Sequence, residues 1–285
     1  MQRIPHPAIA KVALRDGTRV PALGLGTWHM GESARAAARE RAALALGLDL
    51  GMTLIDTAEM YGDGCAETLV GDAVAGRREG VFIVSKVYPH NAGRKSAIAA
   101  CKRSLKRLRT ECLDLYLLHW RGRIPLAETV AAFTELVREG LVRRWGVSNF
   151  DVADMEELYA IEGGDACSVN QVLYNLSERA VEWRLLEWCR AYRVALTAYS
   201  PVGQGELLRN RRLAAIARGL GRTPAQVALA WLLRHHDVIA IPQSSDPQHL
   251  RDNRVAAGLA LDRATLEALD AAFPPPRQPT TISVI

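Results

Sequence analysis

The chain has 285 residues, of which 49% are apolar, 6% aromatic and 24% charged. These values fit a folded protein with one large core or two smaller ones, and they exclude a disordered, collagen-like or coiled-coil chain. No run of about 18 uncharged apolar residues occurs, and residues 1–20 contain no apolar signal-peptide core, so we expect a cytoplasmic protein with no membrane partner. Five cysteines without a CxxC pair favour reduced thiols over disulfides or a zinc site.

The formal net charge is +5, and the one dense basic run covers residues 94–109. A basic surface can indicate nucleic-acid binding, but this run carries Ile98, Cys101, Leu105 and Leu108 at helical spacing. The pattern is typical of the solvated face of an amphipathic helix. We therefore expect no nucleic-acid partner, although the positive charge would favour an anionic cofactor.

Strand-like apolar runs alternate with helical patterns along nearly the whole chain, which is typical of parallel strands joined by crossover helices. Asp16 and Gly17 form a favoured two-residue turn, which predicts a hairpin of residues 11–14 and 18–20 before this alternation. The expected parallel strands are residues 22–25, 53–56, 81–86, 113–119, 144–148, 168–171, 195–199 and 238–241. The expected helices include residues 33–48, 66–75, 96–108, 126–139, 181–191 and 224–234.

Eight strand–helix units in about 250 residues fit an α/β fold of the (β/α)₈ TIM-barrel type better than a doubly wound sheet. No linker interrupts the alternation before Pro274–Pro276, so we expect a single domain over residues 1–285, with the hairpin at about 10–20 and a C-terminal tail at about 274–285. Catalytic residues of such barrels lie at the carboxyl ends of the strands and in the loops that follow.

Four ionisable residues occupy such positions. Asp56, Lys86 and His119 each end an apolar run, and Tyr61 lies in the loop after Asp56. Each residue alone has a structural explanation, as a helix cap, an exposed strand end or a core side chain. Together they predict acid catalysis, because a neighbouring ammonium should lower the pKa of a buried phenol toward the working range of a general acid. Asp56 would then hold Lys86, and His119 would donate a hydrogen bond to a substrate oxygen.

These residues stand within the motifs Gly24-Leu25-Gly26-Thr27-Trp28, Leu54-Ile55-Asp56-Thr57-Ala58-Glu59-Met60-Tyr61-Gly62, Val84-Ser85-Lys86-Val87, Leu113 to Trp120, Gly146-Val147-Ser148-Asn149-Phe150 and Ala198-Tyr199-Ser200-Pro201. Together these motifs resemble the aldo-keto reductase superfamily over essentially the full chain. Within that family, the chain is most similar to bacterial methylglyoxal reductases, through residues 56–67 and 85–91.

The resemblance implies reduction of aldehydes or ketones, with a hydride from a reduced nicotinamide and a proton from Tyr61. It places Ser148, Asn149 and Gln171 at the carboxamide and stacks Tyr199 on the nicotinamide ring. Trp28, Tyr88 and Trp120 would form apolar walls around the substrate, and Met60 is expected to pack. The full set of cofactor contacts it implies is Gly26, Thr27, Trp28, Asp56, Ser148, Asn149, Gln171, Tyr199, Ser200, Pro201, Val202, Leu207, Ile241, Pro242, Gln243, Ser244, Ser245, His249, Asp252 and Asn253.

The sequence departs from the family where NADPH-preferring members usually carry a Lys and an Arg that bind the adenosine 2′-phosphate. Gln243 and His249 stand at those positions. Ser244, Ser245, the amide end of the following helix or Arg251 could bind the phosphate instead. The expectation is NADPH, with NADH as the open alternative.

Other interpretations explain fewer residues. Gly24 and Gly26 lack the third glycine of a Rossmann fingerprint, because His29 stands at its position. A metal-dependent hydrolase would need more ligands at the strand ends, and adjacent His235 and His236 point apart, so no metal is expected. A non-catalytic, cofactor-binding regulatory protein remains the alternative function. The expected protein is a monomer that acts on a small carbonyl compound.

Overall fold

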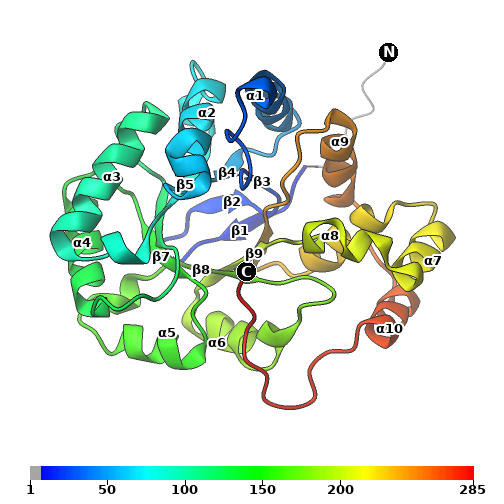
Figure 1. Ribbon diagram of the computed structural model, residues 1–285. Helices are drawn as coiled ribbons and strands as arrows, with labels where there is room; N and C mark the ends of the chain where they lie inside the picture. Colours follow the sequence, from blue (N-terminus) through cyan, green and yellow to red (C-terminus); the bar gives the residue numbers. More distant parts are fainter. Residues whose placement is uncertain (1–7) are drawn as a thin grey trace.

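The computed structural model describes residues 8–285. Residues 1–7 of the expected domain lie outside the described residues. A ring of helices surrounds eight parallel strands, as Figure 1 shows, and this confirms the (β/α)₈ fold with its N-terminal hairpin. The hairpin strands are β1 (Lys11–Ala13) and β2 (Arg19–Pro21). The barrel strands are β3 (Leu25–Gly26), β4 (Leu54–Asp56), β5 (Phe82–Val87), β6 (Leu115–Leu118), β7 (Trp145–Ser148), β8 (Val169–Leu173), β9 (Ala195–Tyr199) and β10 (Val238–Ala240).

Each barrel strand pairs in parallel with the next one along the chain, from β3 to β10. The barrel closes between its first and last strands, because Leu23 forms a parallel bridge with Ala240 and the amide of Gly26 donates to the carbonyl of Pro242 at 3.1 Å. A Cβ atom on Gly26 would lie 2.7 Å from the carbonyl oxygen of Ile241. The seam therefore requires glycine at this position.

The first barrel strand is shorter than expected. Residues 22–24 pair with the last strand through this bridge and its neighbouring hydrogen bonds, so the regular strand begins only at Leu25. The other seven strands lie within two residues of the expected bounds.

The helices are α1 (Ala34–Asp49), α2 (Cys65–Ala73), α3 (Arg94–Leu108), α4 (Leu126–Arg138), α5 (Val152–Tyr159), α6 (Leu185–Tyr192), α7 (Arg211–Gly219), α8 (Pro224–Leu233), α9 (Pro247–Ala256) and α10 (Arg263–Ala272). They cover the outside of the barrel, and at least one of them joins each barrel strand to the next (Figure 1). Helix α6 begins later than expected, because residues 180–182 form a separate 3₁₀ turn. Helices α5, α7, α9 and α10 lie outside the six expected segments, and each begins after an Asp or Asn whose side chain accepts from the first turn.

The hairpin closes the amino-terminal end of the barrel. Its side chains Val12, Leu14 and Val20 are buried in one cluster with apolar residues that point into the barrel, among them Leu54 and Val169. A second and larger cluster lies between the strands and the helices. The carboxyl ends of the strands are therefore left to form a cavity.

Truncation of Leu14 should destabilise the protein. The side chain is 4% exposed, and a large-to-small change at such a site costs about 2–5 kcal/mol of unfolding free energy. Urea unfolding of Leu14→Ala measures this loss. Leu220→Ala is the control, because Leu220 is 37% exposed and should change the free energy by less than about 0.5 kcal/mol. Equal losses in the two variants would contradict the packing role of the hairpin.

Candidate active site

The four ionisable residues lie together at the carboxyl ends of β4, β5 and β6. Lys86 Nζ donates to Asp56 Oδ1 at 2.5 Å, to the carbonyl of Thr57 at 2.9 Å and to Tyr61 Oη at 3.1 Å. The ring of His119 makes an edge contact with the ring of Tyr61, with centroids 5.7 Å apart. One ammonium group thus connects the carboxylate, the phenol and the start of the loop that carries the phenol.

A tight turn brings Tyr61 back over the strand ends. Its amide donates to the carbonyl of Ala58 at 3.1 Å, and the following Gly64 has a φ of 89°, a left-handed conformation that favours glycine. Helix α2 begins directly afterwards, at Cys65. The loop between β4 and α2 is therefore short and fixed at both ends.

Burial and charge set the protonation states of this cluster. Burial alone would lower the pKa of Lys86, but the Asp56 carboxylate and Tyr61 raise it above its usual value, so the ammonium stays charged. Burial raises the pKa of Tyr61, and Lys86 offsets that rise only in part. The expected lowering of the Tyr61 pKa is therefore wrong for the net shift, because desolvation of the phenolate outweighs the attraction of the ammonium. Tyr61 keeps its proton at neutral pH.

His119 is held neutral. Burial, together with the nearby Lys86 ammonium, lowers the pKa of His119 to about 2. Its Nδ1 atom is buried without a hydrogen-bond partner among the described residues. A neutral imidazole in this position can donate one hydrogen bond and accept another, but it carries no charge.

Amide and hydroxyl groups from β7, β8 and β9 extend the site. Gln171 Nε2 donates to the second oxygen of Asp56 at 2.8 Å, so both carboxylate oxygens are satisfied. Tyr199 Oη donates to Asn149 Oδ1 at 2.9 Å, and Ser148 Oγ donates to the carbonyl of Gln171 at 2.8 Å. These bonds fix the polar side chains that the family resemblance assigns to a carboxamide.

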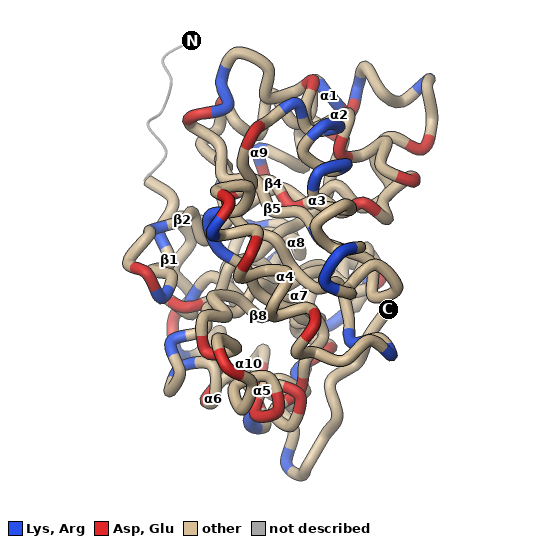
Figure 2. Tube along the Cα trace, turned by 90° about the vertical axis from the view of Figure 1, so that its left-hand side faces the viewer, with Lys and Arg blue, Asp and Glu red and all other residues tan. Residues whose placement is uncertain are grey.

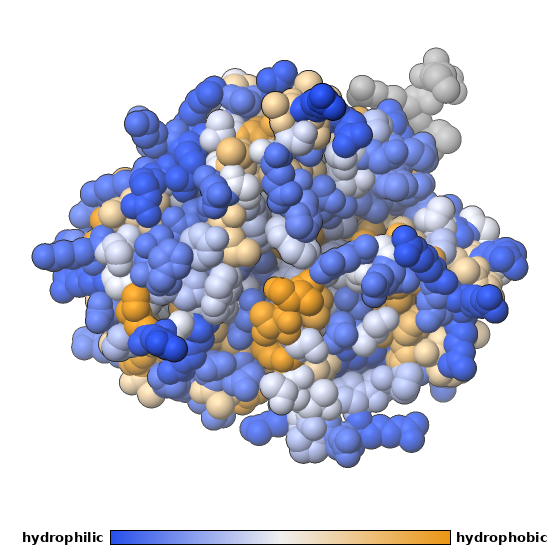
Figure 3. All heavy atoms as spheres, viewed as in Figure 1, coloured by the Kyte–Doolittle hydropathy of each residue, from blue (hydrophilic) through white to orange (hydrophobic). Residues whose placement is uncertain are grey.

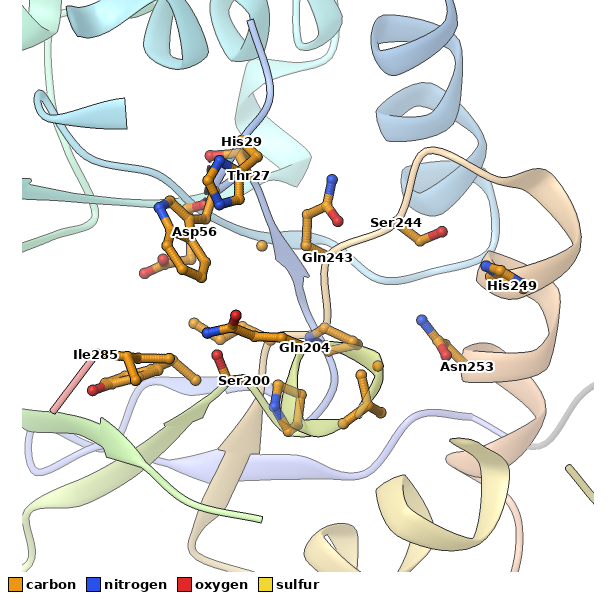
Figure 4. A pocket seen from close by; sticks show the side chains of 18 of the residues that line it. Thr27, His29, Asp56, Ser200, Gln204, Gln243, Ser244, His249, Asn253 and Ile285 are labelled. Atoms are coloured by element: carbon orange, nitrogen blue, oxygen red, sulfur yellow. Dashed lines mark hydrogen bonds between the residues drawn. The ribbon is translucent and has the colours of Figure 1, made fainter. Parts of the chain in front are cut away.

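A cavity of about 870 Å³ opens at these strand ends. In Figure 4, Asp56 and Ile285 lie toward one end of it, and Ser244, His249 and Asn253 lie toward the other. The predicted site residues that line it are Gly26, Thr27, Trp28, Asp56, Tyr61, His119, Trp120, Ser148, Asn149, Gln171, Tyr199, Ser200, Pro201, Val202, Ile241, Pro242, Gln243, Ser244, Ser245, His249, Asp252 and Asn253.

Three predicted residues lie outside this lining. Lys86 is fully buried behind Asp56 and Tyr61. Tyr88 makes an edge contact with Trp120, with ring centroids 6.0 Å apart, and so supports the wall from behind. Leu207 is buried in the core, and the neighbouring Leu208 lines the cavity in its place.

The sequence did not indicate several lining residues. Met60, which was expected to pack, lines the cavity, and Ile285 reaches it from the C-terminal tail. Figure 3 shows an apolar patch near the middle of this face, beside the C-terminus in Figure 1, where Val284 and Ile285 are exposed. No local pattern marks a tail residue as part of a cavity. The other additions are His29, Gln204, Gly205, Thr223, Pro224, Ala225 and Asp246.

The far end of the cavity differs from the expected phosphate site. The amides of Gln248 and His249 at the start of α9 already donate to Asp246 Oδ1, at 2.7 and 3.1 Å. Arg251 donates to the carbonyl of Pro247 and lies outside the lining. The hydrogen bonds from the amides of His249 and Gln248, with the His249 and Arg39 side chains nearby, lower the pKa of Asp246. The Asp246 carboxylate thus occupies the amide end of the helix, which is one of the groups expected to bind the phosphate.

The basic run forms the outer face of α3, as expected, and acidic side chains compensate it. In Figure 2, acidic positions of neighbouring elements lie near the basic positions of this helix. The ion pairs are Arg94–Glu135, Lys102–Glu139, Arg103–Glu59, Arg107–Glu67 and Arg109–Asp72.

The described residues 8–285 hold neither a cluster of metal ligands nor a membrane-spanning helix. No three His, Cys, Asp or Glu side chains in this part of the chain are grouped as metal ligands. No described helix has the length and apolar character needed to span a bilayer.

The neutral state of His119 predicts a loss of stability in acid. Its pKa of about 2 in the folded chain lies below the ordinary value of 6.5, so the unfolded chain binds more protons between these values. The free energy of unfolding should therefore decrease as the pH falls below about 6.5. In His119→Gln the slope of the unfolding free energy against pH should be smaller, by an amount that corresponds to up to about one bound proton per molecule. Urea unfolding between pH 7.5 and 5 measures both slopes, and equal slopes would contradict a buried neutral imidazole.

Comparison with known proteins identifies the family. The pattern of the Aldo/keto reductase family matches residues 22–273. Methylglyoxal reductase YeaE of Escherichia coli is 49% identical over 93% of this chain and 95% of that protein, and glyoxal reductase of Bacillus subtilis is 34% identical over 91% of each. An aldo-keto reductase from Klebsiella pneumoniae, crystallised with NADPH, superimposes with a TM-score of 0.95 at 45% identity, over 98% of this chain and 100% of that one. The chain therefore belongs to the aldo/keto reductase family.

Proposed function

We propose that this chain reduces aldehydes and ketones to alcohols with NADPH, and that its substrates are small reactive carbonyl compounds such as methylglyoxal. The observation that carries the proposal is the buried Lys86 ammonium, which holds a protonated Tyr61 at the edge of a cavity large enough for a cofactor and a small substrate. The names of the relatives from Escherichia coli and Bacillus subtilis support the substrate class.

The residues present fit a nicotinamide cofactor. Ser148, Asn149 and Gln171, whose side chains are held in place by hydrogen bonds, would hold its carboxamide, and the ring of Tyr199 would stack on the nicotinamide ring. Gln243, Ser244 and Asn253 would contact the adenosine end. A reduced nicotinamide, when bound, supplies the hydride that adds to the carbonyl carbon.

The side chains of this chain supply the proton and the orientation. Tyr61 Oη donates its proton to the carbonyl oxygen as that oxygen gains charge, so the product is a neutral alcohol. Lys86 stabilises the phenolate that Tyr61 becomes, and Asp56 keeps Lys86 charged and in place. His119, neutral throughout, orients the carbonyl oxygen through a hydrogen bond. Water then returns the proton to Tyr61.

The walls near Tyr61 favour small substrates. Trp28, Met60, Trp120 and Ile285 line the cavity with large apolar side chains, and the ring of Trp120 contacts the ring of His119, with centroids 4.9 Å apart. Tyr88 would act on this wall indirectly, through its contact with Trp120. A short dicarbonyl leaves few groups for such a wall to recognise, so selectivity would rest on size.

We propose NADPH as the preferred cofactor, with NADH as the alternative. The Klebsiella pneumoniae relative was crystallised with NADPH and also with NADP and acetate, which supports this choice. Ser244, Ser245 and His249 line the cavity where a 2′-phosphate would lie, whereas the Asp246 carboxylate would repel it. The preference for NADPH should therefore be modest.

The assembly and location are proposals as well. We propose a single domain that works as a monomer without nucleic acid, because every candidate catalytic group comes from one chain and the basic face of α3 is paired with acids. A cytoplasmic location is supported by five free thiols, which fit a reducing compartment.

The first measurement is the loss of reduced-nicotinamide absorbance with methylglyoxal, run in parallel with NADPH and NADH. Oxidation of either cofactor would establish the reductase. Cofactor binding without oxidation, across a panel of aldehydes and ketones, would instead favour a non-catalytic regulatory protein.

Tyr61→Phe should separate binding from chemistry. The variant loses only the proton donor, so the reduction rate should fall about 10²- to 10⁴-fold while cofactor affinity changes little. Steady-state kinetics and quenching of tryptophan fluorescence measure the two quantities. Normal turnover by this variant would contradict the mechanism.

Asp246→Ser should increase selectivity for NADPH. Serine keeps the N-cap of α9 but removes the carboxylate, so the dissociation constant for NADPH should fall by about 3- to 10-fold. The constant for NADH, which has no 2′-phosphate, should stay within about 2-fold. Fluorescence titration of both cofactors gives the values, and an equal change for the two would place the phosphate away from Asp246.

A further inference from the structure

Glu59 is a buried carboxylate to which the proposed chemistry assigns no role. It lies in the loop between β4 and α2, three residues after Asp56 and two before Tyr61. The residue is 7% exposed and does not line the cavity. Burial of a carboxylate costs free energy unless it is well satisfied, so its partners indicate what it does.

The backbone of this loop continues the pairing of β4 with β5. The amide of Thr57 donates to the carbonyl of Val84 at 2.9 Å, and the amide of Glu59 donates to the carbonyl of Lys86 at 3.3 Å. In a continued parallel ladder, the amide of Tyr88 would next donate to the backbone carbonyl of Glu59. Instead it donates to the Glu59 side chain, with a distance of 2.8 Å to Oε1.

The Glu59 carboxylate thus replaces its own backbone carbonyl as the acceptor for the next amide of the ladder. The chain is then free to turn, and Tyr61 folds back so that its phenol reaches Lys86 Nζ at 3.1 Å. Glu59 bonds to the carbonyl of Lys86 and to the amide of Tyr88, and so holds both sides of Val87.

Two further contacts keep the carboxylate in place. Asn91 Nδ2 donates to Glu59 Oε1 at 3.0 Å, and Arg103 of α3 approaches Oε2 at 3.6 Å. The Arg103 side chain is half exposed, so this ion pair contributes little by itself. The two hydrogen bonds to Oε1 are the contacts that join the loop of Tyr61 to the loop after β5.

We propose that Glu59 is a positioning residue, which sets the distance between Tyr61 and Lys86 by joining the loop after β4 to the end of β5. This inference rests on the proposed reductase function. A displacement of about 1 Å at a reacting group can cost up to about 10²-fold in rate. Loss of the hydrogen bonds that Glu59 Oε1 accepts should therefore have a measurable effect on catalysis.

Asp114 provides a matched control at the other end of the same strand. Its Oδ2 accepts from the amide of Ile83 at 3.0 Å and pairs with Arg78 at 2.8 Å. Like Glu59, it is a poorly exposed carboxylate that accepts from a backbone amide at one end of β5 and lies near an arginine. Asp114 lies near the amino end of β5, away from the cavity, so its loss should affect stability alone.

The experiment compares Glu59→Leu, Glu59→Gln and Asp114→Leu with the natural chain. For Glu59→Leu we expect kcat with methylglyoxal to fall about 10- to 100-fold, with KM and the dissociation constant for NADPH within about 3-fold. The solvent deuterium isotope effect on kcat should rise, because proton transfer from a displaced Tyr61 becomes more rate-limiting. Glu59→Gln keeps an acceptor for Tyr88 and should restore kcat to within about 3-fold of the natural chain.

The controls separate positioning from stability. Asp114→Leu should lower the unfolding midpoint at least as much as Glu59→Leu, yet keep kcat and the isotope effect unchanged. An unchanged kcat or isotope effect in Glu59→Leu, or equal losses of kcat in Glu59→Leu and Asp114→Leu, would overturn the inference. Absence of turnover in the natural chain would contradict the proposed function instead.

Glu59→Asp carries the test if Glu59→Leu does not fold. The shorter side chain withdraws the carboxylate from Tyr88 but keeps its charge near Arg103. A fall of about 5-fold or more in kcat, with a raised isotope effect, supports the inference. A kcat and an isotope effect equal to those of the natural chain would overturn it.

Discussion

The candidate site depends on one buried positive charge. An isolated ammonium in the protein interior would cost several kcal/mol, and Lys86 avoids this cost through a carboxylate, a carbonyl and a phenol. The carboxylate in turn is held by Gln171 of β8, across the barrel. Satisfying this charge therefore fixes the relative positions of β4, β5 and β8. It also explains why a protonated phenol lies at the cavity edge, since Lys86 offers its third hydrogen there.

Much of the fold and the centre of the site follow from local patterns. Apolar runs of strand length gave seven of the eight barrel strands to within two residues, because fully buried parallel strands leave a strong signal. The parallel arrangement then puts the last residue of each strand on one rim, so Asp56, Lys86 and His119 could be grouped before any contact was known. Helix caps such as Asp151 and Asp262 carried a signal for the remaining helices.

Other features arise from tertiary contacts that no local pattern records. The pKa of Tyr61 depends on how completely the fold removes water, and this outweighs a neighbouring charge that the sequence does reveal. The place of Ile285 in the cavity depends on the path of the tail across the barrel mouth. In the sequence, Asp246 resembles an ordinary helix cap. Only the structure shows that its carboxylate lies at the end of the cavity where a phosphate was expected.

The seam of the barrel bears on how the protein is made. Strand β3 lies near the start of the chain and β10 near its end, and the cavity is lined by residues that follow each of them, such as Thr27 and Gln243. A ribosome synthesises these two halves of the site more than two hundred residues apart. A nascent chain thus holds no complete dinucleotide site until its last strand has emerged. Cofactor binding can stabilise only the finished barrel, and it offers no help to the growing chain.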